Sequence, residues 1–99
     1  MPQITYVQNA LENLGEIAEF WRENPTVGRR AIQEIRERIK KLKTLPNIGK
    51  PSPDDAGKTR LLTVPFGSSG YVVRYCFDPT LDTVFILAVR NFRQAGFIE

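Results

Sequence analysis

The chain has 99 residues, of which 41% are hydrophobic and 25% charged, which is the length and balance of one globular domain. It has no histidine and one cysteine, Cys76, which excludes an internal disulfide, histidine-dependent catalysis, and zinc sites built on histidine or several cysteines. The net charge is +3, and no apolar run approaches the length of a membrane span. We therefore expect a single cytoplasmic domain over residues 1–99, with no metal, no cofactor and no membrane contact.

The N-terminal region is predicted to form a strand and then a helix. Ile4 to Val7 is a short apolar stretch that fits an edge strand. Asn9 and Glu12 have the spacing of a capping box, which places the start of a helix at Asn9. The apolar face of this helix consists of Leu11, Leu14, Ile17, Ala18 and Trp21.

A second helix is predicted from Pro25, which suits the first helical position, to Leu45, where a following proline stops it. Almost no linker separates the two helices, so they should pack as an antiparallel hairpin. Residues 29–50 carry eight basic side chains against two acidic ones, and such a stretch attracts phosphate or an acidic protein surface. The alternative is a solvated helix face, on which opposite charges four residues apart, such as Arg30 and Glu34, partly neutralise each other.

The remaining sequence changes from loop to strand. A loop rich in proline and glycine spans residues 46–58. Three strands separated by turn residues should follow as an antiparallel meander, formed by Arg60–Phe66, Tyr71–Phe77 and Thr83–Arg90. Val84 to Val89 is apolar at both alternating sets of positions, which predicts burial on both faces of that strand. Because a helix hairpin covers only one face of a sheet, the second face needs the C-terminal tail, a second copy or a partner chain.

Four short motifs occur in order along these elements. They are Pro46-x-x-Gly49, Arg60-x-Leu62, Gly70-Tyr71-x-x-x-Tyr75, and the run Asp82-x-Val84-x-Ile86-Leu87-x-Val89-Arg90-Asn91-x-Arg93. With the order of the elements, these motifs resemble the RelE/ParE family of toxins from type II toxin–antitoxin modules. The resemblance implies an α+β fold with a short N-terminal strand, a helix hairpin and a three-stranded antiparallel meander. It also implies a small cognate antitoxin of the ribbon–helix–helix type as partner, with operator DNA bound only through that antitoxin.

The resemblance implies two activities on this one fold. RelE-like members are ribosome-dependent endoribonucleases that cut mRNA, and ParE-like members poison DNA gyrase by binding to it. RelE-like chemistry uses an arginine after the Gly-Tyr motif, another arginine after the last strand, and a tyrosine near the C terminus. Here these positions hold Val72, Phe92, and Phe97 with Ile98, none of which carries a charge or transfers a proton.

The resemblance therefore favours a ParE-like toxin that inhibits DNA gyrase by binding, has no catalytic residue, and is neutralised by its antitoxin. Two alternatives stay open. One is a RelE-like endoribonuclease, and the other is an inactive toxin that serves only as an antitoxin-binding co-repressor.

Three groups of residues are candidates for contact with partners. Arginine next to phenylalanine is typical of an interface centre, and target binding is assigned to Arg90, Asn91, Phe92, Arg93 and Phe97. The alternative is that the two phenylalanines fold back onto the open face of the sheet. A second candidate is a polar cluster, although its tyrosines also fit core packing, formed by Arg60, Tyr71, Arg74 and Tyr75. Contacts at the rim of a bound antitoxin are assigned to Arg29, Arg30, Arg36 and Arg38.

Overall fold

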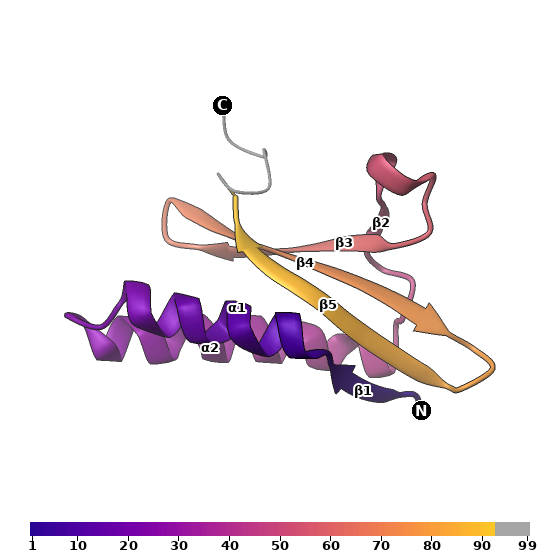
Figure 1. Cartoon of the computed structure of the whole chain (residues 1–99), viewed down its shortest axis with the longest axis horizontal. Helices are drawn as coiled ribbons and strands as arrows, with labels where there is room; N and C mark the ends of the chain where they lie inside the picture. Colours follow the sequence, from indigo (N-terminus) through magenta and orange to yellow (C-terminus); the bar gives the residue numbers. More distant parts are fainter. Residues whose placement is uncertain (93–99) are drawn as a thin grey trace.

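Five strands form one sheet in the computed structural model, which describes residues 1–92, and two helices pack against one face of that sheet (Figure 1). The helices are α1 (Gln8–Phe20) and α2 (Pro25–Lys40), and the 3-10 turns are η1 (Lys41–Lys43) and η2 (Pro53–Asp55). The strands are β1 (Gln3–Tyr6), β2 (Lys50–Pro51), β3 (Arg60–Phe66), β4 (Ser69–Asp78) and β5 (Thr83–Asn91). Their order in the sheet is β1-β5-β4-β3-β2.

The strand pairing confirms the predicted α+β fold. Strands β3, β4 and β5 are consecutive antiparallel neighbours, as expected for a meander. Strand β1 lies at one edge and runs parallel to β5, with Gln3 opposite Thr83. Strand β2, which lies inside the predicted loop, adds the other edge. No helix among residues 1–92 is long and apolar enough to cross a membrane.

The hydrophobic core lies between the helix hairpin and the sheet. Residues three and four apart on each helix turn toward the sheet, and the buried positions are Ala10, Leu14 and Ile17 of α1 with Ala31, Ile35 and Ile39 of α2. From the sheet the core receives Leu62, Val64, Tyr71, Val73, Tyr75, Val84, Ile86 and Val89. The hairpin turn is tight because a Cβ on Gly28 would lie 2.9 Å from the Cβ of Trp21.

The start of α1 differs from the prediction. The helix begins at Gln8, and Asn9 makes no capping bond. Instead the Asn9 side chain donates a hydrogen bond to the carbonyl of Leu87 at 3.0 Å, and the Asn13 side chain accepts one from the backbone N–H of Val89 at 2.9 Å. The reason is that β1 ends before it covers the outer edge of β5, so other groups must pair with that backbone. The predicted apolar face is also shifted, because Leu11 is exposed.

The end of the second helix is shorter than predicted. Regular helix ends at Lys40, and the chain continues as η1 and a turn before Pro46. The expected ion pairs between side chains four residues apart do not form. Within the part of α2 and η1 that the structure describes, the ion pair present joins Lys40 to Glu37, three residues away. Most of the positive charge of this region is therefore not neutralised by neighbouring carboxylates.

Strand β5 is buried on one face rather than two. Val84, Ile86 and Val89 are buried toward the helices, whereas Phe85 and Ala88 on the opposite face are only partly buried. A bulge interrupts the register with β4, because Arg74 lies opposite Ala88 and Tyr75 opposite Ile86. The prediction of burial on both faces was wrong for the outward side chains, since the hairpin covers only the inner face (Figure 1).

Candidate functional site

The turn after η1 is held by a cluster of three motif residues. The Tyr75 hydroxyl, on a fully buried side chain, accepts a hydrogen bond from the backbone N–H of Gly49 at 2.9 Å. The Arg60 Nη1 donates to the carbonyls of Gly49 at 2.8 Å and Asn47 at 3.3 Å. A Cβ at position 49 would lie 2.7 Å from Cε1 of Tyr75, so only glycine allows this approach. We name this arrangement of Gly49, Arg60 and Tyr75 the Gly49 clamp.

Tyr75 in this clamp is not suited to transfer protons. Burial raises the pKa of the Tyr75 phenol, and this effect outweighs the opposing influence of the Gly49 N–H and of Arg60. Its hydroxyl lies in the interior and already has a backbone partner. The clamp therefore fixes the path of the chain between η1 and β2.

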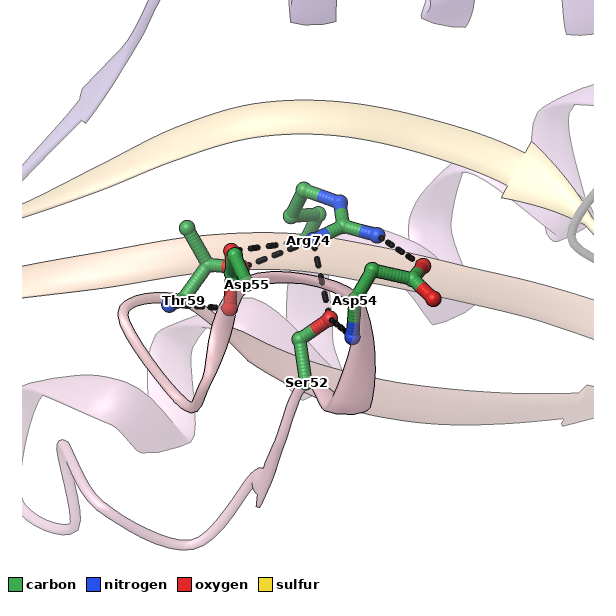
Figure 2. A network of polar contacts seen from close by, with 5 residues as sticks. All are labelled: Ser52, Asp54, Asp55, Thr59 and Arg74. Carbon is green, nitrogen blue, oxygen red and sulfur yellow. Dashed lines mark hydrogen bonds and ion pairs between the residues drawn. The ribbon is translucent and has the colours of Figure 1, made fainter.

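Arg74 lies on the other face of the sheet, because neighbouring residues of a strand point in opposite directions. Figure 2 shows its guanidinium reaching the loop around η2. Its Nη1 donates to the Thr59 hydroxyl at 2.7 Å and the Ser52 hydroxyl at 3.1 Å. Two carboxylates complete the site, Asp55 and Asp54, each 3.4 Å from a guanidinium nitrogen. We name these five residues the Arg74 network.

The Arg74 network contains more acidic than basic groups. The pKa of Asp55 is lowered chiefly by the hydrogen bond from the Thr59 hydroxyl, with smaller contributions from the Thr59 N–H and from Arg74, and burial opposes this shift. One guanidinium thus faces two carboxylates, which leaves little attraction for a phosphate group. The arrangement ties β4 to the η2 loop.

The four residues of the predicted polar cluster do not come together. Arg60 and Tyr75 meet at Gly49, and Arg74 joins η2 on the opposite face. Tyr71 lies at the other end of β4, where its hydroxyl accepts a hydrogen bond from Trp21 Nε1 at 3.1 Å. Both tyrosines are part of the core, which is the packing role considered for them.

The end of β5 carries the residues assigned to target binding. Arg90 is exposed and makes no hydrogen bond or ion pair with a residue that the structure describes. The backbone N–H of Phe92 donates to the Gly70 carbonyl at 3.0 Å, and its ring lies 2.7 Å from where a Cβ of Gly70 would be. Phe92 thus packs against the start of β4, in keeping with the alternative that it folds back onto the sheet. Arg93 and Phe97 lie outside the described residues, as does Ile98.

Three of the four arginines assigned to the antitoxin rim contact the protein itself. Arg30 lies over the ring of Phe66 at 5.7 Å, and Arg36 lies over the ring of Tyr6 at 5.2 Å. Arg38 Nε donates to the carbonyl of Thr63 at 3.1 Å. Only Arg29 of the four is exposed without such a contact in the described part of the chain. These arginines thus connect α2 to β3, through Arg30 and Arg38, and to β1, through Arg36.

A groove that sequence reasoning missed lies between α1 and the β4–β5 end of the sheet. Its volume is about 380 Å³, and its walls combine apolar and polar side chains, namely Asn13, Glu16, Ile17, Phe20, Trp21, Phe66, Ser69, Gly70, Tyr71, Val89 and Asn91. Phe20 at its border is 76% exposed. The sequence offered one signal, because Phe20 is an aromatic residue that lies off the apolar face of α1. The strands that form the other wall of the groove depend on the tertiary fold.

The sequence and the fold both match known toxins. A family model described as "ParE toxin of type II toxin-antitoxin system, parDE" matches residues 4–96. The chromosomal ParDE toxin–antitoxin system from P. aeruginosa contains a chain with a TM-score of 0.74 at 20% identity, covering 92% of this chain and 96% of that one. A search of curated protein sequences finds no match.

Two further solved structures share the fold. A chain of the RelBE2 toxin–antitoxin complex from Mycobacterium tuberculosis has a TM-score of 0.61 at 20% identity, covering 92% of this chain and 99% of that one. A chain of the intact RelBE toxin–antitoxin complex from E. coli has a TM-score of 0.58 at 18% identity, covering 91% and 95%. At these identities the likeness shows the fold alone.

Proposed function

The chain belongs to the ParE toxin family of type II toxin–antitoxin systems, and on that premise we propose that it inhibits DNA gyrase by binding, without catalysis of its own. A cognate antitoxin of the ribbon–helix–helix type would neutralise it in the cytoplasm and connect it to operator DNA. The three solved structures described above are of toxin–antitoxin systems, which supports the antitoxin as a partner.

The observation that carries this proposal is that the polar side chains suited to catalysis are already bound to other groups of the protein. RNA cleavage through a 2′-hydroxyl needs a base, an acid and cations near the phosphate. In the described residues, Arg60 is bound to backbone carbonyls, Arg74 to two carboxylates, and Tyr75 to a backbone N–H. Val72, at the position of a RelE-like arginine, is buried and apolar. These arrangements favour binding over catalysis.

The exposed end of β5 supports a binding role. The side chain of Arg90 is exposed and has no partner among the described residues, and the backbone N–H of Phe92 is bound to the carbonyl of Gly70 at the start of β4. A backbone that is already paired in the sheet favours tight contact, because less backbone entropy is lost on binding. Arginine is among the residue types that contribute most at interfaces.

A supercoiling assay with purified gyrase tests the proposal. We expect the wild-type chain to inhibit supercoiling and Arg90→Ala to weaken that inhibition by about thirtyfold or more, the effect of one interface hot spot. Arg22→Ala, which removes another exposed arginine from the hairpin turn, is the matched control and should inhibit like wild type. Melting temperature and antitoxin binding should be unchanged in both variants. If wild-type protein at micromolar excess leaves supercoiling unchanged, the gyrase assignment fails.

The likeness to RelBE complexes favours a second candidate, a ribosome-dependent endoribonuclease. Codon-specific mRNA cleavage in a reconstituted translation system, lost in Arg60→Ala or Arg74→Ala, would establish it in place of gyrase inhibition. A chain that binds antitoxin but affects neither gyrase nor mRNA would instead be an inactive co-repressor.

A further inference from the structure

The segment between α2 and β3 presents a basic surface that the four assigned arginines do not include. Residues 38–50 contain no acidic residue. We name the exposed part of this segment the lysine ridge, formed by Lys40, Lys41, Lys43, Leu45, Ile48 and Lys50. Among the described residues, the side chains of Lys41, Lys43 and Lys50 make no hydrogen bond or ion pair, and the side chain of Lys40 has only the exposed Glu37 at 3.5 Å. This charge is therefore available to a partner.

Two aliphatic side chains are exposed within the same segment. Leu45 is 54% and Ile48 42% exposed, although both are large and apolar. The negative end of the α2 dipole explains lysines in the last helical turn and in η1. It does not explain Lys50, which lies in β2, or the exposure of Leu45 and Ile48. Leu45 and Ile48 share this exposed segment with the unpaired lysine side chains, and exposed apolar side chains rimmed by polar ones are typical of interaction sites.

The Gly49 clamp holds this surface in one conformation. Gly49 is bound at its N–H by Tyr75 and at its carbonyl by Arg60, which also holds the carbonyl of Asn47. The backbone N–H of Leu45 donates to Lys41, and that of Ile48 donates to Leu45. Ile48 and Lys50 flank the clamped glycine on either side. A surface fixed in this way loses little entropy when a partner binds.

We propose that the lysine ridge binds an acidic segment of a partner protein that also carries aliphatic side chains. The charge complementarity selects an acidic partner, and the aliphatic pair selects a protein over nucleic acid. A phosphate backbone would use the lysines alone and leave Leu45 and Ile48 in water. That the antitoxin supplies this segment rests on the proposed function.

The position of the ridge separates it from the surface proposed for target binding. Strands β3 and β4 lie between β2, which carries Lys50, and β5, which carries Arg90, and Figure 1 shows β2 to the right of the end of β5. A segment bound only at the ridge therefore leaves Arg90 uncovered. Neutralisation of the toxin then requires the antitoxin to continue beyond the ridge.

Titration of the full-length chain with its purified antitoxin tests the inference through two pairs of variants. We expect Lys43→Glu/Lys50→Glu to weaken binding about tenfold or more at low salt and to reduce the salt dependence of the association rate. Leu45→Ser/Ile48→Ser should weaken binding to a similar degree with the salt dependence unchanged. The matched controls are Arg22→Glu, which reverses one charge at the other end of the helix hairpin and is compared with Lys43→Glu alone, and Leu81→Ser, which removes another exposed leucine. Both should bind like wild type.

Equal losses in ridge and control variants would overturn the inference, because general electrostatics would then explain the binding. Wild-type affinity in both ridge variants would also overturn it, as would duplex DNA that binds the chain with the same dependence on Lys43 and Lys50. Circular dichroism and melting confirm that each variant folds. The gyrase assay tests the proposed function and not the ridge. If the wild-type chain does not inhibit gyrase, the proposed function is refuted, and the affinities of the ridge variants for the antitoxin still test the inference.

Discussion

Two arginines with the same chemistry hold successive parts of one loop from opposite faces of the sheet. Arg60 lies opposite Tyr75 in the β3–β4 register and binds the backbone at residues 47 and 49. Arg74, one residue before Tyr75, binds the side chains of the η2 loop. Because a guanidinium offers five donors in a fixed plane, each arginine can bind several acceptors at once. The loop from η1 to β3 is thus fixed although it has little regular structure.

The Arg74 network predicts a dependence of stability on pH. The pKa of Asp55 is lower in the folded chain than its ordinary value of 3.8, so protonation favours the unfolded chain. The stability that Asp55 contributes is therefore complete above that ordinary value and is lost as the pH falls through the lower, folded-state pKa. We expect Asp55→Asn to flatten this acid limb of urea-unfolding curves. Asp82→Asn, an exposed carboxylate in the turn before β5, is the control and should leave the acid limb as in wild type.

At the scale of elements, three different groups satisfy the backbone hydrogen bonds along the outer edge of β5. Strand β1 pairs with its first half, and the backbone N–H of Val7 donates to Ile86. The side chains of Asn9 and Asn13 then pair with Leu87 and Val89. Helix α1 therefore acts as a substitute for the missing end of β1. This arrangement fixes the helix along the strand, in addition to its apolar contacts.

The Asn13 contact can be tested by stability. Asn13→Ala leaves the partly buried N–H of Val89 without its acceptor, and we expect the free energy of unfolding to fall by about 1–2 kcal/mol. Asn13→Asp retains an acceptor oxygen and should lose less. Urea unfolding monitored by circular dichroism measures both values. A loss in Asn13→Asp as large as in Asn13→Ala would show that the bond to Val89 contributes little.

The sequence predicts those elements whose pattern is local. Periodic apolar residues and turn residues indicated both helices and the meander, and Pro25 indicated the start of α2. Asn9 was assigned to a helix cap because local spacing cannot show that β5 lies within reach. The Gly49 clamp required the β3–β4 register and the packing of a loop, neither of which a single sequence contains. The polar cluster was wrong for a similar reason, since its members are distributed over both faces and both ends of β4.

At the scale of the molecule, charge and apolar surface are unevenly distributed. Four glutamates of the hairpin lie within or just after α1, namely Glu12, Glu16, Glu19 and Glu23, whereas the lysine ridge lies at the far end of α2. On the face of the sheet away from the helices, Phe85 and Ala88 remain only partly buried. A small domain with this distribution has distinct surfaces for partners of different charge.

The partly open face predicts self-association of the isolated chain. We expect the wild-type protein to associate with increasing concentration, because apolar side chains around Phe85 gain from leaving water. Phe85→Lys should reduce that association, as measured by light scattering. Leu81→Lys introduces the same charge in a turn and should not reduce it to the same extent. A monomer at all concentrations in wild type would contradict the prediction.

The parallel pairing of β1 with β5 also determines when the chain can fold. Gln3 pairs with Thr83, so the sheet is complete only after the two strands most distant in sequence have paired. Contacts this far apart in sequence slow folding, because a long loop must be ordered before the contact is gained. On the ribosome, β1 and the helix hairpin emerge first. They have no β5 to pack against until the end of the chain has been synthesised. A chain that terminates prematurely before β5 therefore yields an unfolded product rather than a partly active one.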